Sequence, residues 1–269
     1  MELINVEAQI KNSNSALLKK LPRFVVRWLA KITYQDEING IVTKFEDSVG
    51  VEFLPKVLKE LNIQVEIEGL ENLPENGKCF FVANHPFGIA DGLILTHTIA
   101  SKYGDFRAIG NEVFVLVPQL RPVIAAVNVF GTNPKEYLQA LDNVFNSEIP
   151  ITHFPAGLVS RIRDWKVRDS KWHKSFVSKS VSCERDIVPF YFYGRNSNLF
   201  YAVFLFRKLF RIKATLELAL LPHELFNKKN KTIRLKIGNP ISHLTFDKSK
   251  SHQEWTDYVQ GLVYGMKQE

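Results

Sequence analysis

His85 and Asp91 are the residues of this chain whose types and spacing are best suited to chemistry. An apolar run, 79–83, precedes them and predicts a buried strand, and turn-forming residues follow it. Asp91 lies where apolar residues at helical spacing begin, so both side chains are expected to face one crevice. An imidazole can take a proton from a hydroxyl near neutral pH, and a carboxylate can orient that imidazole. The pair has no nucleophile of its own, so we expect the substrate to supply one.

Simpler roles for these residues remain open at this point. Asp91 could act as a helix N-cap, and His85 could be a strand-end histidine bonded to backbone. Ser160 and Cys183 are poor candidates for a nucleophile, because neither lies in a G-x-S-x-G or thiolate-like context. Cys79 and Cys183 show no metal or disulfide pattern, which fits a reducing compartment.

Three further blocks place turn residues next to predicted strands. The segment 127–133 contains Gly131, and 154–161 reads Phe-Pro-Ala-Gly-Leu-Val-Ser-Arg. The run Ile-Val-Pro-Phe at 187–190 is followed by Gly-Arg-Asn-Ser-Asn at 194–198.

In this order, the four blocks resemble the motifs of the lysophospholipid acyltransferase superfamily, over roughly residues 65–240. Most members separate the His and the Asp by four residues, whereas five, Pro86 to Ala90, intervene here. That departure, with the block at 194–198, is similar to the bacterial hemolysin-like branch that O-acylates lyso-aminolipids such as ornithine and glycine lipids. Ala156 stands where most of the superfamily has Glu, so the role of that carboxylate is not carried over.

The resemblance implies site roles for named residues. His85 is expected to be the general base and Asp91 the residue that orients it. Arg161 is a candidate for holding a lipid head group, because guanidinium binds carboxylate or phosphate bidentately. The expected substrate-binding residues are Asn84, Gly88, Gly131, Phe154, Pro155, Gly157, Ser160, Arg161, Pro189 and Arg195. No metal site and no bound cofactor are expected, and acyl-carrier protein or coenzyme A is expected to carry the acyl donor.

The formal net charge of +7 favours an anionic partner. From Ala8 to Gln35 there is no acidic residue, while apolar residues recur at helical spacing between Leu17 and Ile32. This pattern is typical of a helix lying on an anionic membrane surface, with an ordinary packed amphipathic helix as the alternative. Pro22 is expected to begin this helix or to kink it.

The rest of the chain predicts an α/β fold with a central, mostly parallel sheet flanked by helices. Strand-like runs alternate with helical patterns, and the expected ligand crevice lies at the carboxyl ends of the strands. We therefore divide the chain into an N-terminal helical region with a basic amphipathic arm, 1–64, and an acyltransferase domain, 65–269. His85, Gly157 and Pro189 are each expected just after a strand end. Uncharged apolar runs stop short of the roughly 20 residues that a membrane span needs.

These features predict a peripheral O-acyltransferase on the cytoplasmic face of a bacterial inner membrane, acting on a lyso-aminolipid. One alternative is an enzyme acylating 1-acylglycerol-3-phosphate, which shares the His and Asp. Another is a non-catalytic lipid-binding protein of the same fold. A nucleic-acid binder is disfavoured, because the basic residues interleave with apolar ones and no recognised motif is present.

Overall fold

The computed structural model describes residues 3–12, 19–20, 22–111, 117–127, 135–212 and 215–268. Within these residues a seven-stranded sheet has the order β1-β9-β8-β2-β5-β3-β4. All neighbouring pairs are parallel except β8 with β9. The predicted α/β fold with a mostly parallel sheet is therefore confirmed. The strands are β1 (Gln64–Glu68), β2 (Cys79–Ala83), β3 (Arg107–Asn111), β4 (Ile124–Val127), β5 (Ile151–His153), β8 (Asp186–Phe192) and β9 (Thr232–Ile237).

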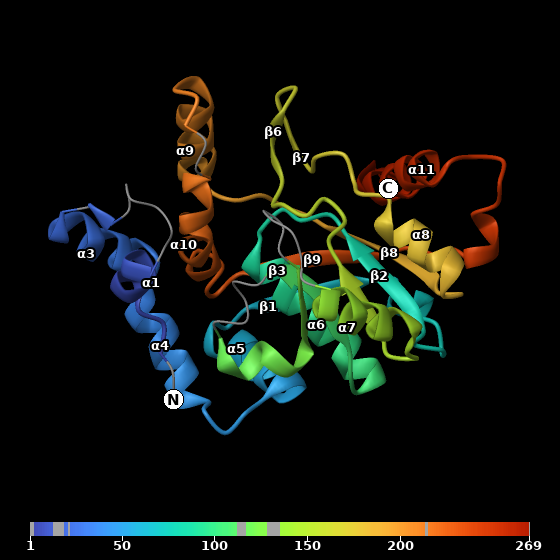
Figure 1. Ribbon diagram of the computed structural model, residues 1–269, viewed down its shortest axis with the longest axis horizontal. Helices are drawn as coiled ribbons and strands as arrows, with labels where there is room; N and C mark the ends of the chain where they lie inside the picture. The colour runs from blue at the N-terminus through green and yellow to red at the C-terminus, as the bar shows by residue number, and fades with distance from the viewer. Residues whose placement is uncertain are drawn as a thin grey trace.

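Helices cover both faces of this sheet (Figure 1). The α-helices are α1 (Val6–Asn12), α3 (Arg23–Ile32), α4 (Gln35–Lys44), α5 (Phe53–Glu60), α6 (Ile89–Tyr103), α7 (Lys135–Asn146), α8 (Ser175–Ser182), α9 (Asn198–Leu209), α10 (Leu221–Phe226) and α11 (His252–Gly265). Short 3-10 helices are η1 (Gly50–Glu52), η2 (Leu70–Asn72), η4 (Pro118–Val123), η5 (Leu216–Leu220), η6 (His243–Thr245) and η7 (Met266–Gln268).

Strand β2 shows why the sheet needs two covering layers. All five of its side chains are buried, and successive side chains point to opposite faces. Phe81 and Ala83 join the cluster under α4, α5 and α6, whereas Phe80 and Val82 join the cluster under α7, α8 and α11. The continuous apolar run that predicted this strand is thus explained by burial on both faces.

Pro22 directly precedes α3, so the helix begins at this proline rather than kinking there. One side of α3 is half-buried, and Ile32 packs against the cluster of α9 and η5. Phe24 and Trp28 lie on the exposed side. The first part of the predicted amphipathic stripe falls on residues 13–18 and 21, outside the described residues.

Two elements project from the body at the top of Figure 1: α9 and a two-stranded hairpin. The hairpin pairs β6 (Arg161–Arg163) with β7 (Lys166–Arg168) in antiparallel register. None of the helices in the described ranges is both long enough and apolar enough to cross a membrane.

Candidate active site

The site forms where three neighbouring parallel strands end. Strand β2 lies between β8 and β5 in the sheet, so the segments that follow these three strands meet at one edge. They carry His85 after β2, Phe154 to Gly157 after β5, and Gly194 after β8. Blocks that are far apart in sequence are therefore brought together, as expected for a crevice at the carboxyl ends of a parallel sheet.

His85 and Asp91 face each other across one tight turn. His85 Nδ1 lies 3.1 Å from Asp91 Oδ1, a close contact that is not aligned as a hydrogen bond. Because Nδ1 faces the carboxylate, Nε2 is the ring nitrogen left for a substrate. The Phe154 ring stacks on the imidazole, with centroids 4.0 Å apart and planes 23° apart. The imidazole and the carboxylate thus lie within contact distance of each other, as the predicted pairing of a base with an orienting carboxylate expects.

Asp91 is fixed from its own helix end. Its side chain is fully buried in the first turn of α6. The carboxylate accepts hydrogen bonds from the Phe87 N–H at 2.8 Å and from its neighbour Gly92 N–H at 2.9 Å. These donors and the positive end of α6 stabilise the negative charge of the carboxylate. The N-cap position belongs to Gly88, so Asp91 is not the simple N-cap that was considered as the alternative.

Gly88 makes the turn between His85 and Asp91 possible. Its backbone has φ +91°, a conformation that side-chain-bearing residues rarely adopt. A Cβ at this position would also lie 2.7 Å from a Leu221 methyl carbon. The turn between His85 and Asp91 therefore passes through a position that requires glycine.

A second carboxylate, Asp169, fixes the backbone of His85. Asp169 Oδ1 accepts the His85 N–H at 3.2 Å and the Ser160 hydroxyl at 2.5 Å, and Oδ2 accepts Trp172 Nε1–H at 2.9 Å. The Ser160 N–H in turn donates to the His85 carbonyl at 2.8 Å. Both backbone groups of His85 are thus held by the segment 160–169.

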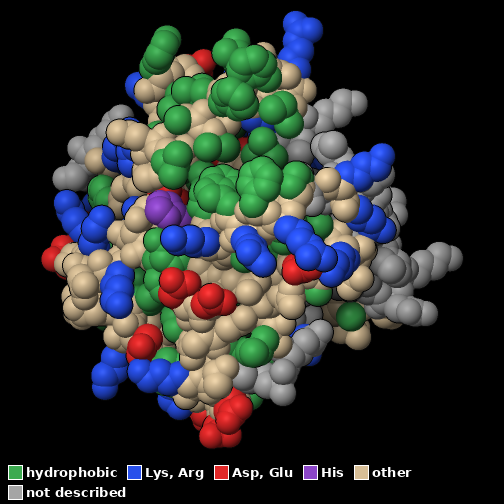
Figure 2. Space-filling model, turned by 90° about the vertical axis from the view of Figure 1, so that its left-hand side faces the viewer, with side chains coloured by type: hydrophobic (Ala, Val, Ile, Leu, Met, Phe, Trp, Pro, Cys, Tyr) green, Lys and Arg blue, Asp and Glu red, His purple; other side chains and the backbone are tan. Residues whose placement is uncertain are grey.

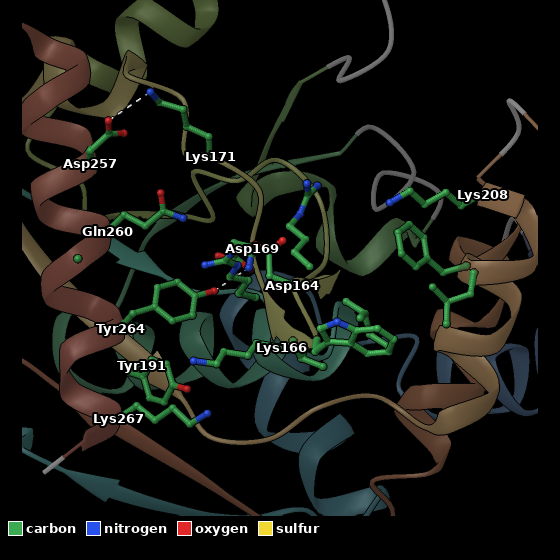
Figure 3. Close-up of a pocket in the computed structure, with 18 of the residues that line it drawn as sticks. Asp164, Lys166, Asp169, Lys171, Tyr191, Lys208, Asp257, Gln260, Tyr264 and Lys267 are labelled. Atoms are coloured by element: carbon green, nitrogen blue, oxygen red, sulfur yellow. Dashed lines mark hydrogen bonds and ion pairs between the residues drawn. The ribbon is translucent and has the colours of Figure 1, made fainter. Parts of the chain in front are cut away.

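Asp169 is almost completely buried, and Tyr264 of α11 accepts a hydrogen bond from its N–H at 2.7 Å (Figure 3). Burial raises the pKa of the Asp169 carboxyl, while the bonds from Ser160 and Trp172 act in the opposite direction. Asp169 was not predicted from the sequence as a site residue. It lies in a basic stretch with Asp164, which is exposed, and nothing in the local pattern separates the two.

A cavity of about 1150 Å³ opens beside the imidazole. Its size exceeds the roughly 300–1,000 Å³ of most small-molecule pockets. His85 and Gly88 line it, together with Phe154, Pro155 and Gly157 of the predicted site. The remaining wall is mostly apolar and is supplied by Ile38, Ile41, Val42, Phe53, Leu54, Val57, Leu93, Leu120, Leu141, Phe145 and Phe176, among others. Such a wall suits a hydrocarbon chain.

Two further histidines, His153 and His173, also line this cavity. Burial, together with repulsion from His173, lowers the pKa of His153 to about 4. His153 Nδ1 is buried without a hydrogen-bond partner among the described residues. His153 directly precedes the block 154–161, but no charge or spacing pattern in the sequence distinguished it as a site residue.

Other predicted binding residues do not line the cavity. Asn84 exchanges hydrogen bonds with the Phe192 backbone, accepting at 2.7 Å and donating at 3.0 Å. It therefore ties the end of β2 to the end of β8. Ser160 is committed to Asp169, as described above. Gly131 lies outside the described residues.

Arg161 follows Ser160 in the chain but does not line the cavity beside His85. Its Nε is 3.2 Å from Glu217 Oε1, and its guanidinium lies over the rings of Phe200 and Phe204. Arg161 is buried, and burial lowers the pKa of its guanidinium while Glu217 acts in the opposite direction. These contacts join the hairpin to α9 and η5, so the predicted role in head-group binding gains no geometric support.

Pro189 departs from its expected position. It lies inside β8, beside Val82 of β2, rather than just after a strand end. The antiparallel pairing of β8 with β9 begins at Phe190. Pro189, which has no N–H to donate, therefore removes no hydrogen bond from that pairing. The prediction failed because an interior proline usually marks the end of a strand.

Arg195 lies in the exposed loop after β8, with its guanidinium over the Tyr201 ring and bonded to Asn198. Its neighbour Gly194 has φ +131°, and a Cβ there would lie 2.5 Å from the Phe87 ring. The block at 194–198 thus packs against the turn between His85 and Asp91 and supports it from outside.

Comparisons with known proteins agree with this geometry. A model of the acyltransferase family matches residues 9–269. This chain belongs to that family. The acyltransferase is 39% identical over 263 residues to the lyso-glycine lipid O-acyltransferase of Phocaeicola vulgatus, covering 97% of this chain and 94% of that protein. It is 36% identical to the lyso-glycine lipid O-acyltransferase of Bacteroides thetaiotaomicron, covering 97% of each.

Among solved structures, the acyltransferase aligns with the 1-acyl-sn-glycerophosphate acyltransferase of Thermotoga maritima. The TM-score is 0.49 at 18% identity, covering 93% of this chain and 99% of the other. The match to the family model and the two relatives, rather than this structural alignment, confirm the predicted superfamily and the acyltransferase activity. Within the described part of the acyltransferase, no group of His, Cys, Asp or Glu side chains is arranged to hold a metal ion.

Proposed function

We propose that this acyltransferase moves a fatty acyl group from an acyl thioester to the hydroxyl of a lyso-aminolipid, with a lyso-glycine lipid as the favoured acceptor. The observation that carries the proposal is the His85–Asp91 pair at the wall of a large apolar cavity. The substrate class is supported by the two relatives, which are lyso-glycine lipid O-acyltransferases and match along nearly their whole length.

In this mechanism His85 is the general base. Its Nε2 takes the proton of the acceptor hydroxyl while the oxygen attacks the thioester carbonyl carbon. Asp91 holds Nδ1 and stabilises the imidazolium that forms. When the tetrahedral intermediate collapses, the carbon–sulfur bond breaks and the imidazolium returns the proton to the leaving thiolate. The products are the acylated lipid and the free thiol of acyl-carrier protein or coenzyme A.

The acyl chain is assigned to the cavity beside His85, whose apolar wall favours a hydrocarbon. The stacked Phe154 ring restricts the orientation of the imidazole and shields that side of it from water. Phe154, Pro155 and Gly157 are therefore the predicted binding residues that the cavity supports best.

We further propose that the enzyme is peripheral at the cytoplasmic face of the inner membrane, with α3 contacting anionic lipid. Phe24 and Trp28 are exposed beside Arg23, Arg27 and Lys31. Two buried, unpaired cysteines fit a reducing compartment. Replacing Phe24 and Trp28 by Glu is expected to lower flotation with anionic vesicles, and unchanged flotation would remove α3 from this role.

The first test is mass spectrometry of lipids from cells supplied with a lyso-glycine lipid. Cells carrying the wild type are expected to form the diacylated lipid, and cells carrying His85→Ala are not. His252→Ala is the matched control, because His252 is an exposed histidine on α11. Newly acylated phospholipid in place of aminolipid would move the assignment to the acylation of lysophosphatidate. The absence of both products would favour a non-catalytic lipid-binding protein.

A further inference from the structure

Helix α9 exposes apolar side chains where a polar face is expected. Phe200, Tyr201 and Phe204 are buried against the body. On the other side, exposed fractions are 47% for Leu205, 54% for Phe206, 76% for Leu209 and 61% for Phe210 at the C-cap. A surface helix of a globular domain normally presents polar residues to water, so this face is suited to a partner.

The neighbouring hairpin carries a second unusual apolar residue. Asp164 and Trp165 form its two-residue turn, with φ of +47° and +62°. Both central residues of this turn type favour Asn or Gly, and a bulky residue in the left-handed region is uncommon. Trp165 is nevertheless there, 98% exposed. The indole therefore buries almost no surface within the fold, which leaves it available to contact a partner.

These two features form one surface. The β6 strand packs against α9, and both elements project from the body in the same direction (Figure 1). A groove of about 1590 Å³ lies beside them, lined by Trp165, Leu205 and Lys208 among others (Figure 3). We call Trp165, Leu205, Phe206, Leu209 and Phe210 the outer apolar surface.

The charges around this surface are mostly basic, apart from Asp164, which pairs with Arg168, and Asp257, which pairs with Lys171. Residues 187–216 include no Asp or Glu. Among the described residues, Arg163 and Lys166 of the hairpin, Lys208 of α9 and Arg211 just after α9 have no acidic partner. Figure 2 shows hydrophobic side chains gathered on the upper part of the face that carries α3 and α9, with Lys and Arg side chains along the border below.

We propose that the outer apolar surface inserts into the head-group region of an anionic bilayer, as a second membrane contact beside α3. Tryptophan and phenylalanine suit this region, where an apolar body meets polar groups, and unpaired Lys and Arg are attracted to anionic lipid. A second copy of this chain fits poorly, because like charges would face each other across the contact. The inference rests on the proposed function in taking a lipid surface as the partner.

The distance between the two contacts is short, because η5 packs against both α9 and α3. Insertion of α9 and α3 would therefore hold the protein at the membrane in one orientation rather than by one flexible arm. The enzyme would then meet its lipid acceptor with a fixed edge of the sheet toward the bilayer.

The test uses the full chain and vesicles of phosphatidylcholine with or without phosphatidylglycerol. One variant is Leu209→Ser with Phe210→Ser. The other is Trp165→Asn, which suits the turn and is expected to leave the thermal midpoint equal or higher. Leu244→Ser is the matched control, because Leu244 is 79% exposed in η6, beside α8.

The wild type is expected to float with vesicles that contain phosphatidylglycerol and to be released by salt. The double variant is expected to bind about tenfold more weakly, Trp165→Asn several-fold more weakly, and the control equally well. Undiminished binding by both variants would overturn the inference. So would loss of a wild-type dimer in the double variant without loss of vesicle binding, which would assign the surface to self-association.

Acyl transfer to a lyso-glycine lipid in detergent micelles separates this inference from the proposed function. Normal micellar activity with unchanged vesicle binding would defeat the inference alone. An inactive wild type in micelles would defeat the proposed function, and the vesicle result would still decide the membrane contact.

Discussion

Two regions of the molecule differ in how far their side chains are contacted by the rest of the chain. One is the segment around His85, and the other is the outer apolar surface. Around His85, two buried carboxylates are held by other parts of the same chain. Asp91 accepts hydrogen bonds from two backbone N–H groups, and Asp169 accepts from one backbone N–H and two side-chain donors. On the outer apolar surface, Trp165 and Leu209 contact little of their own chain. The contrast shows that this protein positions its chemistry internally and leaves its apolar projections for an external partner.

The largest effect is expected from His85→Ala. Removal of the base should lower turnover about 10²–10⁴-fold while the thermal midpoint stays close to that of the wild type, because His85 contributes little to the core. Steady-state acyl transfer and thermal unfolding measure the two quantities, with His252→Ala as the control. Near-normal turnover would end the assignment of His85 as the base.

Asp91→Asn is expected to lower turnover about 10²-fold. The amide cannot accept from the Phe87 and Gly92 N–H groups and also face His85 as a carboxylate does. The imidazolium would then lose its counter-charge. Kinetics across pH are the measurement, and an unchanged profile with unchanged turnover would leave Asp91 a structural role alone.

Asp169→Ala is expected to combine a moderate loss of turnover, about tenfold, with a loss of unfolding free energy of roughly 3 kcal/mol. Three donors that Asp169 now satisfies would be left without their partner, and the backbone of His85 would lose one of its two anchors. The expected signature is a fall in kcat with little change in KM at a temperature where the variant is folded. A fall in stability with full kcat would make Asp169 purely structural.

The smallest effect is a pH dependence of stability that comes from His153. Its folded-state pKa of about 4 lies below the ordinary value of 6.5, because burial disfavours the charged ring. The unfolded state therefore binds more protons between these values, and stability falls as the pH drops through this window. His153→Phe is expected to remove roughly 2 kcal/mol of that fall between pH 7 and pH 5.

Urea unfolding at several pH values measures this slope. His252→Phe is the control, because that histidine is exposed and its replacement should leave the slope unchanged. An equal slope in His153→Phe and the wild type would show that the His153 ring is not shielded from water enough to shift its pKa. Activity at neutral pH provides a second readout, because His153 lines the cavity.

Several parts of the fold could be predicted because they depend on local periodicity. Strand β2 lies at the predicted apolar run 79–83, and strands and helices alternate as predicted, since apolar runs and helical spacing follow directly from burial. The hairpin was missed, because its turn is built from Asp164 and Trp165 without the Gly or Asn that usually marks one.

Exposure of single side chains could not be predicted in the same way. Trp172 is buried and bonded to Asp169, while Trp165, in the same stretch of sequence, is almost fully exposed. Arg161 likewise lies against Glu217, a residue that is distant in sequence. The surroundings of each depend on which remote segment the fold brings beside it.

The sequence by itself determined the candidate pair His85 and Asp91, the motif order and the alternation of strands and helices, because each is set by residue type and short-range spacing. The tertiary structure decided that Asp169 anchors His85, that the cavity wall is assembled from both halves of the chain, and that α9 and Trp165 face outward together. These outcomes depend on contacts between residues far apart in sequence. Local patterns do not encode such contacts, since hydrogen bonding and burial are settled only when the sheet and its covering helices pack.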